Sequence, residues 1–258
     1  MEREATIKYL SIDLPTKKDH AYIVPFSCLH VGHYLFDEQK FLGYREWVLK
    51  HDNAFCFLNG DLTESAIIGS KGDPYIATMT VSEAKKKIKE LFMPLVEADR
   101  ILGMDSGNHE NRIYEKTGND ISLDIAMFLG LEDVYNKQGL CGTIHLGDVK
   151  YSFYIKHGKG GGKTQAYKMR KMKEMSNVIK NCDMYIMAHI HDILAFQIKP
   201  KFIDVDTDAK YDIKQTFASS SSFMEYGDYA EDGDYEPAKT GSPRIRLDAT
   251  KKDIHVSI

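Results

Sequence analysis

The chain has 258 residues, of which 43% are hydrophobic and 28% charged, and its formal net charge is −4. This composition excludes an intrinsically disordered chain, and the negative charge excludes an overall basic surface for nucleic acid, so nucleic-acid binding would need a local basic patch. The four cysteines are scattered without a CxxC pair, which is typical of a reducing cytoplasm rather than a disulfide framework. No apolar stretch approaches the length of a membrane span. We therefore expect a soluble, cytoplasmic protein that does not act on membranes.

Short apolar runs alternate with helical patterns along most of the chain. Buried strands are expected at five of these runs, residues 21–26, 54–58, 100–104, 151–156 and 184–187. Amphipathic helices are expected over residues 37–51, 82–99, 119–130 and 165–180. Pro94 is expected to kink or divide the second helix. Residues 62–79 are expected to form a loop, and Gly147-Asp148 a hairpin turn.

The last quarter of the chain has a different pattern. Short strands are expected over residues 193–199, 214–219, 244–247 and 253–258. A polar, acidic loop around residues 224–243 interrupts them. Helices alternating with strands, followed by short strands, indicate the α/β (α+β) class. Because there is no repeat and no long linker, we expect a single domain over residues 1–258.

Each of five strand runs is followed at once by a polar cluster. The clusters contain Cys28 and His30, Asp61, Asn108-His109-Glu110, His157, and His189 with His191. In α/β folds, ligands bind at the carboxyl ends of the strands, so these side chains are expected to converge. Nitrogen and oxygen donors with one sulfur suit Zn²⁺, Mn²⁺ or Fe better than Ca²⁺. A single histidine at a strand end is more often structural, but five such ends together favour a metal site.

The same clusters, in this order, resemble the motifs of the calcineurin-like metallophosphoesterase superfamily. Those motifs are Asp-x-His, Gly-Asp, Gly-Asn-His-Asp/Glu, a lone His and Gly-His-x-His. The matches are Cys28-Leu29-His30, Gly60-Asp61, Gly107-Asn108-His109-Glu110, His157 and Ala188-His189-Ile190-His191. The resemblance covers about residues 21–195. It implies a sandwich of two mixed sheets flanked by helices, and two divalent metal ions, for which Mn, Zn, Fe and Ni are candidates.

The resemblance also implies a role for each motif residue. One metal site would use Cys28, His30, Asp61 and His191, and the other would use Asp61, Asn108, His157 and His189. A hydroxide that bridges the two ions would attack the phosphorus atom. His109 would be the catalytic residue that donates a proton to the leaving oxygen or stabilises the phosphate. Glu110 or Asp105 would orient the imidazole of His109, or would simply face solvent.

Two residues depart from the family pattern. Ala188 replaces a glycine, which removes no ligand. Cys28 replaces an aspartate, which changes one. A thiolate at Cys28 would favour Zn²⁺ or Fe over Mn²⁺ or Mg²⁺. The alternative is that Cys28 is inert and the first site is weak or empty.

Several residues near the motifs are candidates for binding the substrate. They are Arg112, His33, Lys159 and Lys163, and the alternative for each is an ordinary surface role or a salt bridge. Residues 158–164 are rich in glycine, but His157 stands where a P-loop needs glycine, so a Walker A motif is excluded. The cluster Lys168-Arg170-Lys171-Lys173 is a candidate for following a nucleic-acid backbone. Tyr226, Tyr229 and Tyr235 are candidates for stacking on a base or for filling a gap between the sheets.

The sequence therefore predicts a metal-dependent phosphoesterase that hydrolyses a phosphomonoester or a phosphodiester. The substrate would be a phosphate ester, with a nucleotide and a nucleic acid both open. Two alternatives remain: a DNA exonuclease of the repair-nuclease type, and a metal-binding scaffold without catalysis. The oligomeric state does not follow from the sequence.

Overall fold

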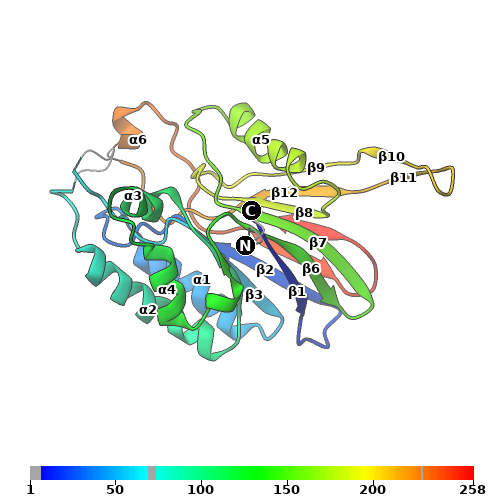
Figure 1. The fold of residues 1–258 in the computed structure, drawn as a ribbon, viewed down its shortest axis with the longest axis horizontal. Helices are drawn as coiled ribbons and strands as arrows, with labels where there is room; N and C mark the ends of the chain where they lie inside the picture. Colours follow the sequence, from blue (N-terminus) through cyan, green and yellow to red (C-terminus); the bar gives the residue numbers. More distant parts are fainter. Residues whose placement is uncertain (1–6, 69–73, 228) are drawn as a thin grey trace.

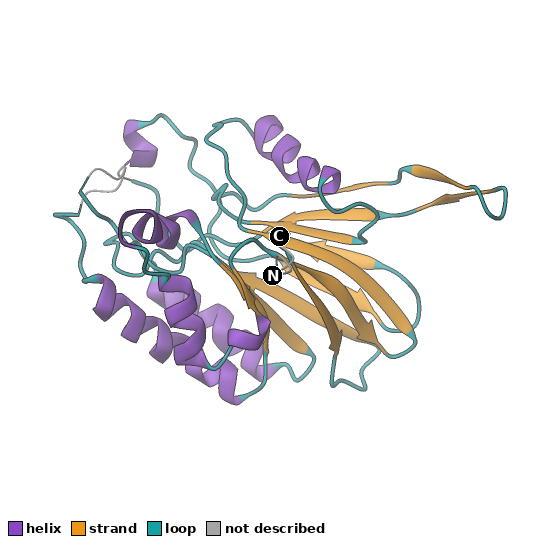
Figure 2. Ribbon diagram, in the orientation of Figure 1, coloured by secondary structure: helices purple, strands orange, loops and turns teal. Residues whose placement is uncertain are grey.

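In the computed structural model, which describes residues 7–68, 74–227 and 229–258, two six-stranded sheets face one another (Figures 1 and 2). The first sheet has the order β14-β13-β2-β3-β4-β5 and the second β1-β6-β7-β8-β12-β9. With helices outside the sheets, this confirms the expected α/β class and the sandwich of two mixed sheets. Residues 69–73, in the loop expected over 62–79, lie outside the described residues.

The strands that carry the polar clusters lie in the middle of the sheets. The first sheet contains β2 (His20–Phe26), β3 (Ala54–Asn59), β4 (Ile101–Asp105), β5 (Tyr135–Asn136), β13 (Arg244–Asp248) and β14 (Ile254–Ser257). The second contains β1 (Lys8–Asp13), β6 (Leu140–Leu146), β7 (Val149–Lys156), β8 (Met184–Met187), β9 (Ala195–Ile198) and β12 (Gln215–Ser219). The hairpin turn at Gly147-Asp148 is confirmed between β6 and β7.

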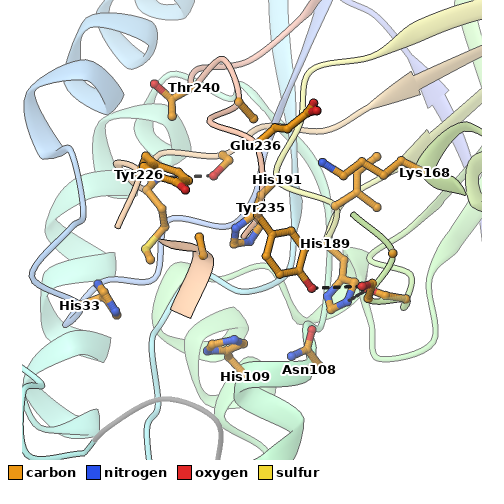
Figure 3. A pocket seen from close by; sticks show the side chains of 18 of the residues that line it. His33, Asn108, His109, Lys168, His189, His191, Tyr226, Tyr235, Glu236 and Thr240 are labelled. Atoms are coloured by element: carbon orange, nitrogen blue, oxygen red, sulfur yellow. Dashed lines mark hydrogen bonds between the residues drawn. The ribbon is translucent and has the colours of Figure 1, made fainter. Parts of the chain in front are cut away.

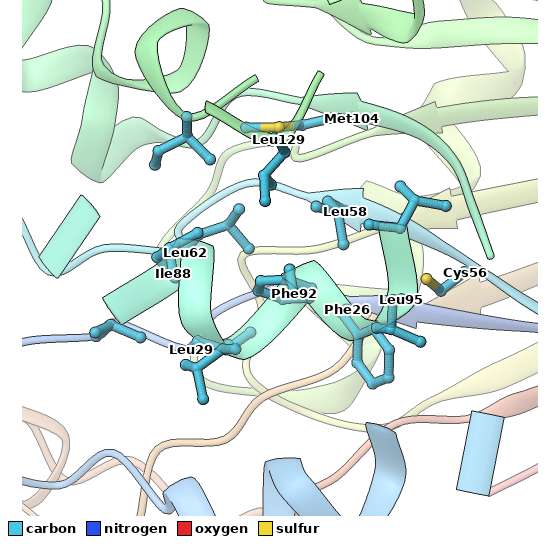
Figure 4. Close-up of a cluster of buried hydrophobic side chains, with 14 of the residues drawn as sticks. Phe26, Leu29, Cys56, Leu58, Leu62, Ile88, Phe92, Leu95, Met104 and Leu129 are labelled. Carbon is cyan, nitrogen blue, oxygen red and sulfur yellow. The ribbon is translucent and has the colours of Figure 1, made fainter. Parts of the chain in front are cut away.

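Three apolar cores hold these layers together. Between the sheets, Phe55 and Phe57 of β3 pack with residues of the second sheet such as Phe153. On its other face β3 presents Cys56 and Leu58 to a second core shared with the helices (Figure 4). A third core lies between the second sheet and α5. Since β3 is buried on both faces, its sequence is a continuous apolar run rather than an alternating one.

The helices cover the outer faces of the sheets. They are α1 (Glu38–Lys50), α2 (Val81–Glu97), α3 (Asn108–Thr117), α4 (Ile121–Leu129), α5 (Gln165–Glu174) and the short α6 (Tyr229–Asp232). In Figure 1, α1, α2 and α4 lie on one side of the sheets and α5 lies on the other, whereas α6 lies beyond the end of the sheets, above α3. Among the described residues, no helix is long and apolar enough to pass through a bilayer.

Pro94 does not divide the second helix, and a kink at this residue stays a prediction. The helix α2 runs through Pro94 and ends at Glu97, and the carbonyl oxygen of Pro94 still accepts a hydrogen bond from Ala98 N. Phe92 and Leu95 on either side of Pro94 are buried in the core. Burying a side chain of this size contributes about 1.5–3 kcal/mol. Packing therefore compensates for the helical hydrogen bond that proline cannot make.

Several elements were not expected from the sequence, including the short strand β5 and the helix α6 inside the loop expected around residues 224–243. The helix α3 begins at Asn108 and buries only Glu110 and Ile113, so it has no apolar stripe that periodicity would reveal. The strands β10 (Lys201–Asp204) and β11 (Ala209–Asp212) form a two-stranded hairpin. Figure 1 shows this hairpin projecting away from the two sheets. The predicted helix over 165–180 is shorter than expected, because a 3-10 turn at Met175–Asn177 follows α5.

Candidate metal centre

The turns that follow five strands meet at one edge of the two sheets. The strands β2, β3 and β4 run parallel in the first sheet, and β7 and β8 run parallel in the second. Parallel strands end on the same side of a sheet, so the residues after them are gathered there. These residues are Cys28, His30, Asp61, Asn108, His157, His189 and His191, all singled out from the sequence.

The backbone at this edge is unusual. Cys28, His30, Asp61, His189 and His191 have positive φ angles of 48°, 51°, 50°, 71° and 45°. For residues other than glycine, this left-handed conformation costs roughly 1–2 kcal/mol each. Such conformations persist only where the surrounding structure imposes them, and they cluster at functional sites. The strain therefore points to this edge independently of the sequence motifs.

Two motif glycines let these turns approach one another. A Cβ atom added to Gly107 would lie 2.1 Å from both Asp61 N and Asp61 Oδ1. A Cβ atom added to Gly60 would lie 2.5 Å from Gly107 N and 2.7 Å from His157 Nδ1. Only residues without a side chain fit at both positions. The glycines thus bring Asp61, His157 and the start of α3 into contact.

Among the described residues, three sets of side chains bring possible metal-binding atoms together. In each set, one donor atom of every residue lies within 4.8 Å of the others. The first set is Cys28, His30, Asp61 and His191, and the second is Asp61, His157 and His189. The third is His30, Glu64 and His109. The amide oxygen Oδ1 of Asn108 lies 3.2 Å from His157 Nε2, beside the second set. These clusters could hold metal ions, and Asp61 belongs to the first two. The assignment of single residues as ligands stays a prediction.

The hydrogen bonds of His157 show why this arrangement suits a cation. Its Nδ1 lies 2.8 Å from the carbonyl oxygen of Asn59, which can only accept, so Nδ1 carries a proton. In the neutral imidazole, Nε2 then presents a lone pair. That atom lies 3.0 Å from Asp61 Oδ2 and 3.2 Å from Asn108 Oδ1, both of which also present lone pairs. Such a group of acceptors is favourable only around a proton or a metal ion.

The same pattern recurs at the other histidines. His30 Nδ1 lies 3.1 Å from the carboxylate oxygen Oε2 of Glu64, and its Nε2 lies 3.2 Å from Nε2 of His191. His189 Nε2 lies 2.8 Å from the carbonyl oxygen of Gly160, which leaves Nδ1 as its lone-pair atom. Hydrogen-bond partners thus orient the rings and leave the inward nitrogen atoms with lone pairs that could bind a metal ion. This is usual for histidines that bind metal. The residues present therefore fit a metal ion.

The pKa values of the histidines at this edge are shifted in opposite directions. Burial lowers the pKa of His157, but the Asp61 carboxylate outweighs it and raises that pKa to about 9. Burial, together with the neighbouring His157, lowers the pKa of His189 to about 4. Burial and the nearby His30 lower the pKa of His191 well below its usual range. Without a metal ion, His157 therefore keeps a proton on Nε2 near neutral pH. A metal ion would replace that proton, because an imidazole binds metal in its neutral form.

Cys28 and Ala188, which depart from the family pattern, are both buried. Burial raises the pKa of the Cys28 thiol well above its usual range, and the Asp61 carboxylate raises it further. A divalent cation would reverse this effect, because a coordinating thiol is deprotonated. Ala188 is not among the described residues with positive φ, so its methyl group requires no backbone strain.

His109 is oriented by a residue that the sequence analysis missed. Its Nδ1 lies 2.8 Å from the backbone carbonyl oxygen of Glu64 and 3.3 Å from Oε2 of the same residue. The buried Glu64 therefore contacts both His30 and His109. It lies three residues after Asp61, a spacing that could have drawn attention to it.

The expected roles of Glu110 and Asp105 beside His109 are wrong, and neither faces solvent. Glu110 instead accepts hydrogen bonds from the backbone N–H groups of Asp61, Thr63 and Gly107 at 2.8–3.2 Å. Asp105 Oδ2 accepts from the backbone N–H of His157 at 2.8 Å. Both carboxyl groups hold the turns in place rather than the imidazole.

A cavity of about 440 Å³ opens beside the cluster (Figure 3). Its walls include Asn108, His109, His189 and His191, together with the candidate substrate-binding residues Arg112 and His33. The other two candidates, Lys159 and Lys163, are exposed and are not among the residues that line it. Lys163 Nζ lies 5.5 Å from the ring centre of Tyr235, which does line the cavity.

The basic cluster around Lys168 is not a continuous basic surface. Lys168 is buried against the cavity and pairs with Asp192 at 3.2 Å, next to His191. Lys171 pairs with Glu174 at 2.6 Å. Arg170 Nε also lies 3.8 Å from Glu174, so three of the four cations have a carboxylate partner. Whether the cluster follows a nucleic-acid backbone stays a prediction. Of the three tyrosines singled out, Tyr226 and Tyr235 line the cavity. The side chain of Tyr229 lies outside the described residues.

Three solved structures are distantly similar to this chain. No protein-family model and no curated protein matches the sequence. A conserved uncharacterized protein from Streptococcus pneumoniae TIGR4, described as a predicted phosphoesterase, is 13% identical with a TM-score of 0.38, and the match covers 92% of this chain and 88% of that one. Vps29 from Chaetomium thermophilum is 10% identical with a TM-score of 0.41, covering 93% and 96%. The calcineurin-like phosphoesterase YfkN from Bacillus subtilis is 14% identical with a TM-score of 0.34, covering 66% and 62%. Likenesses at this distance transfer no function.

Proposed function

We propose that the chain is a metal-dependent phosphoric ester hydrolase of the calcineurin-like metallophosphoesterase type, acting on a phosphomonoester or a phosphodiester. One observation carries the proposal: two sets of metal-binding side chains share Asp61 and adjoin a cavity lined by His109 and Arg112. Buried polar groups in proteins normally find hydrogen-bond donors or acceptors that complement them. Here His157 Nε2, Asp61 Oδ2 and Asn108 Oδ1 converge on one place, which is favourable only around a proton or a metal ion. The ordered sequence motifs support the same conclusion.

The ligand assignment follows the two sets. The first ion would be held by Cys28, His30, Asp61 and His191, and the second by Asp61, Asn108, His157 and His189. Divalent ions there would supply positive charge against the phosphate oxygens and would activate water. Because Cys28 contributes a soft sulfur donor, we expect the first set to prefer Zn²⁺ or Fe over Mn²⁺.

His109 is the proposed proton donor. Hydrolysis breaks the P–O bond to the leaving group and forms one to the oxygen of water, and the leaving oxygen takes up a proton. Burial lowers the pKa of His109, but the carboxylates of Asp61 and Glu64 outweigh it and raise that pKa above its usual value. The raised pKa favours the protonated form that a proton donor needs. With Nδ1 held by Glu64, Nε2 remains to face the substrate.

Arg112 is the proposed phosphate contact. Its Nη1 atom is buried without a hydrogen-bond partner, although the residue lines the cavity. An unpartnered buried donor costs about 1–3 kcal/mol. A phosphate oxygen bound there would remove this cost, and a guanidinium group suits phosphate well.

The test is hydrolysis of mono- and bis-nitrophenyl phosphate by the purified protein with Mn²⁺, Zn²⁺, Fe²⁺ and Ni²⁺. We expect activity with at least one ion, and we expect it to be lost in Asp61→Ala and His109→Ala. The exposed His255, on β14 far along the chain, provides the matched control His255→Ala, which should retain activity. No hydrolysis with any ion would exclude the enzyme. If metal were nevertheless bound by elemental analysis, the protein would be a metal-binding scaffold.

Cys28→Asp tests the first set separately. If Cys28 is a ligand, this change should shift the metal preference towards Mn²⁺ because it replaces sulfur by oxygen. Unchanged metal content and unchanged preference would show that the Cys28 thiol does not coordinate.

A further inference from the structure

A loop from the last quarter of the chain covers the cavity beside the metal cluster. We name it the cap loop and define it as residues 223–227 and 229–240. Its base is closed by Ser222 and Gly241, whose backbones exchange hydrogen bonds of 3.1 and 2.7 Å. Its first residue, Phe223, donates from its backbone N–H to the carbonyl oxygen of Cys28 at 3.1 Å. The cap loop is thus anchored directly on one of the proposed metal-binding turns.

The cap loop also contacts the glycine-rich loop before α5, which comprises residues 158–164. The hydroxyl group of Tyr235 donates to the carbonyl oxygen of Gly161 at 3.1 Å (Figure 3). The ammonium group of Lys163 lies 5.5 Å from the centre of the Tyr235 ring, within the range of a cation–π contact. At Gly162 an added Cβ would lie 2.1 Å from Tyr167 Cδ1, so this loop passes close over the Tyr167 ring. Two loops distant in sequence therefore meet above the cavity.

The cap loop adds two aromatic rings to a cavity whose other wall is built for phosphate. Tyr226 and Tyr235 line the cavity together with His109 and Arg112. In Figure 3, Tyr226 is drawn well above His109, and Tyr235 lies between Tyr226 and Asn108. Aromatic side chains of this kind bind flat rings such as nucleobases by stacking. A volume of about 440 Å³ falls within the roughly 300–1,000 Å³ typical of small-molecule sites.

The charge of the cap loop argues against a polymeric nucleic acid. Its described residues carry five carboxylates, Glu225, Glu231, Asp232, Asp234 and Glu236, against the single ammonium of Lys239. Most of these acidic residues are exposed. A nucleic-acid strand that extended past the cavity would meet this acidic surface, whereas proteins that bind such strands offer cations to the phosphates. A substrate with one phosphate group inside the cavity would avoid it.

We propose that the substrate is a small phosphoester of nucleotide size, with its phosphate at the metal cluster and its base against Tyr226 and Tyr235. This proposal rests on the function proposed above. It distinguishes a mononucleotide from a longer strand, which the sequence leaves open. Tyr226 and Tyr235 are then the residues that select for an aromatic base.

Matched substrates test the proposal by kcat/KM. The monoester pair is adenosine 5′-monophosphate and glycerol phosphate, and the diester pair is adenosine 3′,5′-cyclic monophosphate and bis-glycerol phosphate. Single-stranded and duplex oligonucleotides complete the set. We expect the nucleotide of the relevant pair to be preferred, and both oligonucleotides to be poor substrates. An oligonucleotide cleaved as efficiently as the nucleotide would overturn the proposal while leaving the enzyme function intact.

Variants of the two tyrosines identify the binding surface. Tyr226→Ala and Tyr235→Leu should each lower kcat/KM for the nucleotide by about tenfold, the scale of one lost stacking contact. Glycerol phosphate should change less than about twofold. Tyr235→Phe keeps the ring and removes the hydroxyl group that contacts Gly161, so it should retain the preference for the base. The matched control is Tyr211→Ala on the β10–β11 hairpin, because Tyr211 is 42% exposed and Tyr226 is 43% exposed.

A binding measurement separates this proposal from the proposed enzyme function. The probe is the phosphonate analogue of adenosine 5′-monophosphate, whose P–C bond is not hydrolysed, compared with inorganic phosphate by calorimetry. Tighter binding of the analogue that is lost in Tyr226→Ala would support the base site even if no ester were hydrolysed. Equal binding of analogue and phosphate, or tyrosine variants that behave like Tyr211→Ala, would rule the base site out.

Discussion

Two buried polar groups at different places in the fold show how a structural cluster differs from a functional one. The hydroxyl oxygen of Tyr151 on β7 accepts from the backbone N–H groups of Asp248 and Asp253 at 3.1 and 3.0 Å. Its proton is donated to the carbonyl oxygen of Asp248 at 2.6 Å. Every donor and acceptor of this hydroxyl has a complementary partner within the chain. At the candidate metal centre, by contrast, His157 Nε2 lies next to two acceptor atoms, Asp61 Oδ2 and Asn108 Oδ1.

The two places also differ in their backbone conformation. Tyr151 and its neighbours in β7 have no positive φ, whereas five of the proposed ligands do. Strain and unmatched lone pairs cost folding free energy unless a ligand compensates for them. The Tyr151 cluster is therefore complete by itself, whereas a cation would complete the candidate metal centre. Substitutions at the two places should consequently affect different measurements.

The largest effect is expected from Asp61→Asn. Asp61 belongs to both donor sets, and losing even a residue that only orients a ligand lowers metal affinity by 10–100-fold in general. We expect metal affinity to fall by more than about 100-fold. Thermal unfolding with and without Zn²⁺ measures this, because metal at about 100 times its Kd stabilises a protein by about 2.7 kcal/mol. The wild type should show this increase in Tm. An equal increase in Asp61→Asn would exclude Asp61 as a ligand.

A smaller effect is expected from Glu64→Gln. Glu64 contacts the imidazoles of His30 and His109 through its carboxylate, so the amide should orient both rings less well. We expect metal affinity or kcat/KM to fall by about 10–100-fold, as for other residues that orient metal-binding histidines. The exposed Glu90 on α2 provides the matched control Glu90→Gln, which should change neither. If both variants behave alike, the contacts of Glu64 have no role in the site.

Tyr151→Phe should give the opposite result. Removing the hydroxyl leaves the N–H groups of Asp248 and Asp253 without this acceptor, which should lower the free energy of unfolding by about 1–3 kcal/mol. Urea unfolding measures this loss. Metal affinity should stay at the wild-type value. A loss of metal binding here would contradict the separation between the two places.

The smallest effect is expected from Gly43→Ala, which should change stability slightly and leave metal binding unchanged. A Cβ atom at Gly43, inside α1, would meet nothing within 4 Å. Alanine in a helix interior is favoured over glycine, so we expect stability to rise by about 0.5–1 kcal/mol. Urea unfolding and metal titration should show this small gain with unchanged metal affinity. A destabilised variant would show that α1 is packed differently from the structure described.

Much of the fold could be predicted because its signals are local. The strand β8 (Met184–Met187) and the hairpin turn at Gly147-Asp148 follow from short apolar runs and turn residues. The helix α3 could not be predicted, since Glu110 is one of its two buried residues and pairs with backbone N–H groups of distant turns. The continuity of α2 through Pro94 depends on core packing, which the local preference of proline does not include.

The position of the candidate metal centre was determined by the sequence itself. Apolar runs define the strands, and residues such as Asp61 and His157 follow their carboxyl ends, where parallel strands bring side chains together. Only the tertiary structure decided which atoms face one another. The contact of Glu64 with His109, the unpartnered Nη1 of Arg112 and the cap loop joined to Gly161 all depend on residues far apart in the chain. Local preferences contain no information about such contacts, because they form only when both sheets have packed.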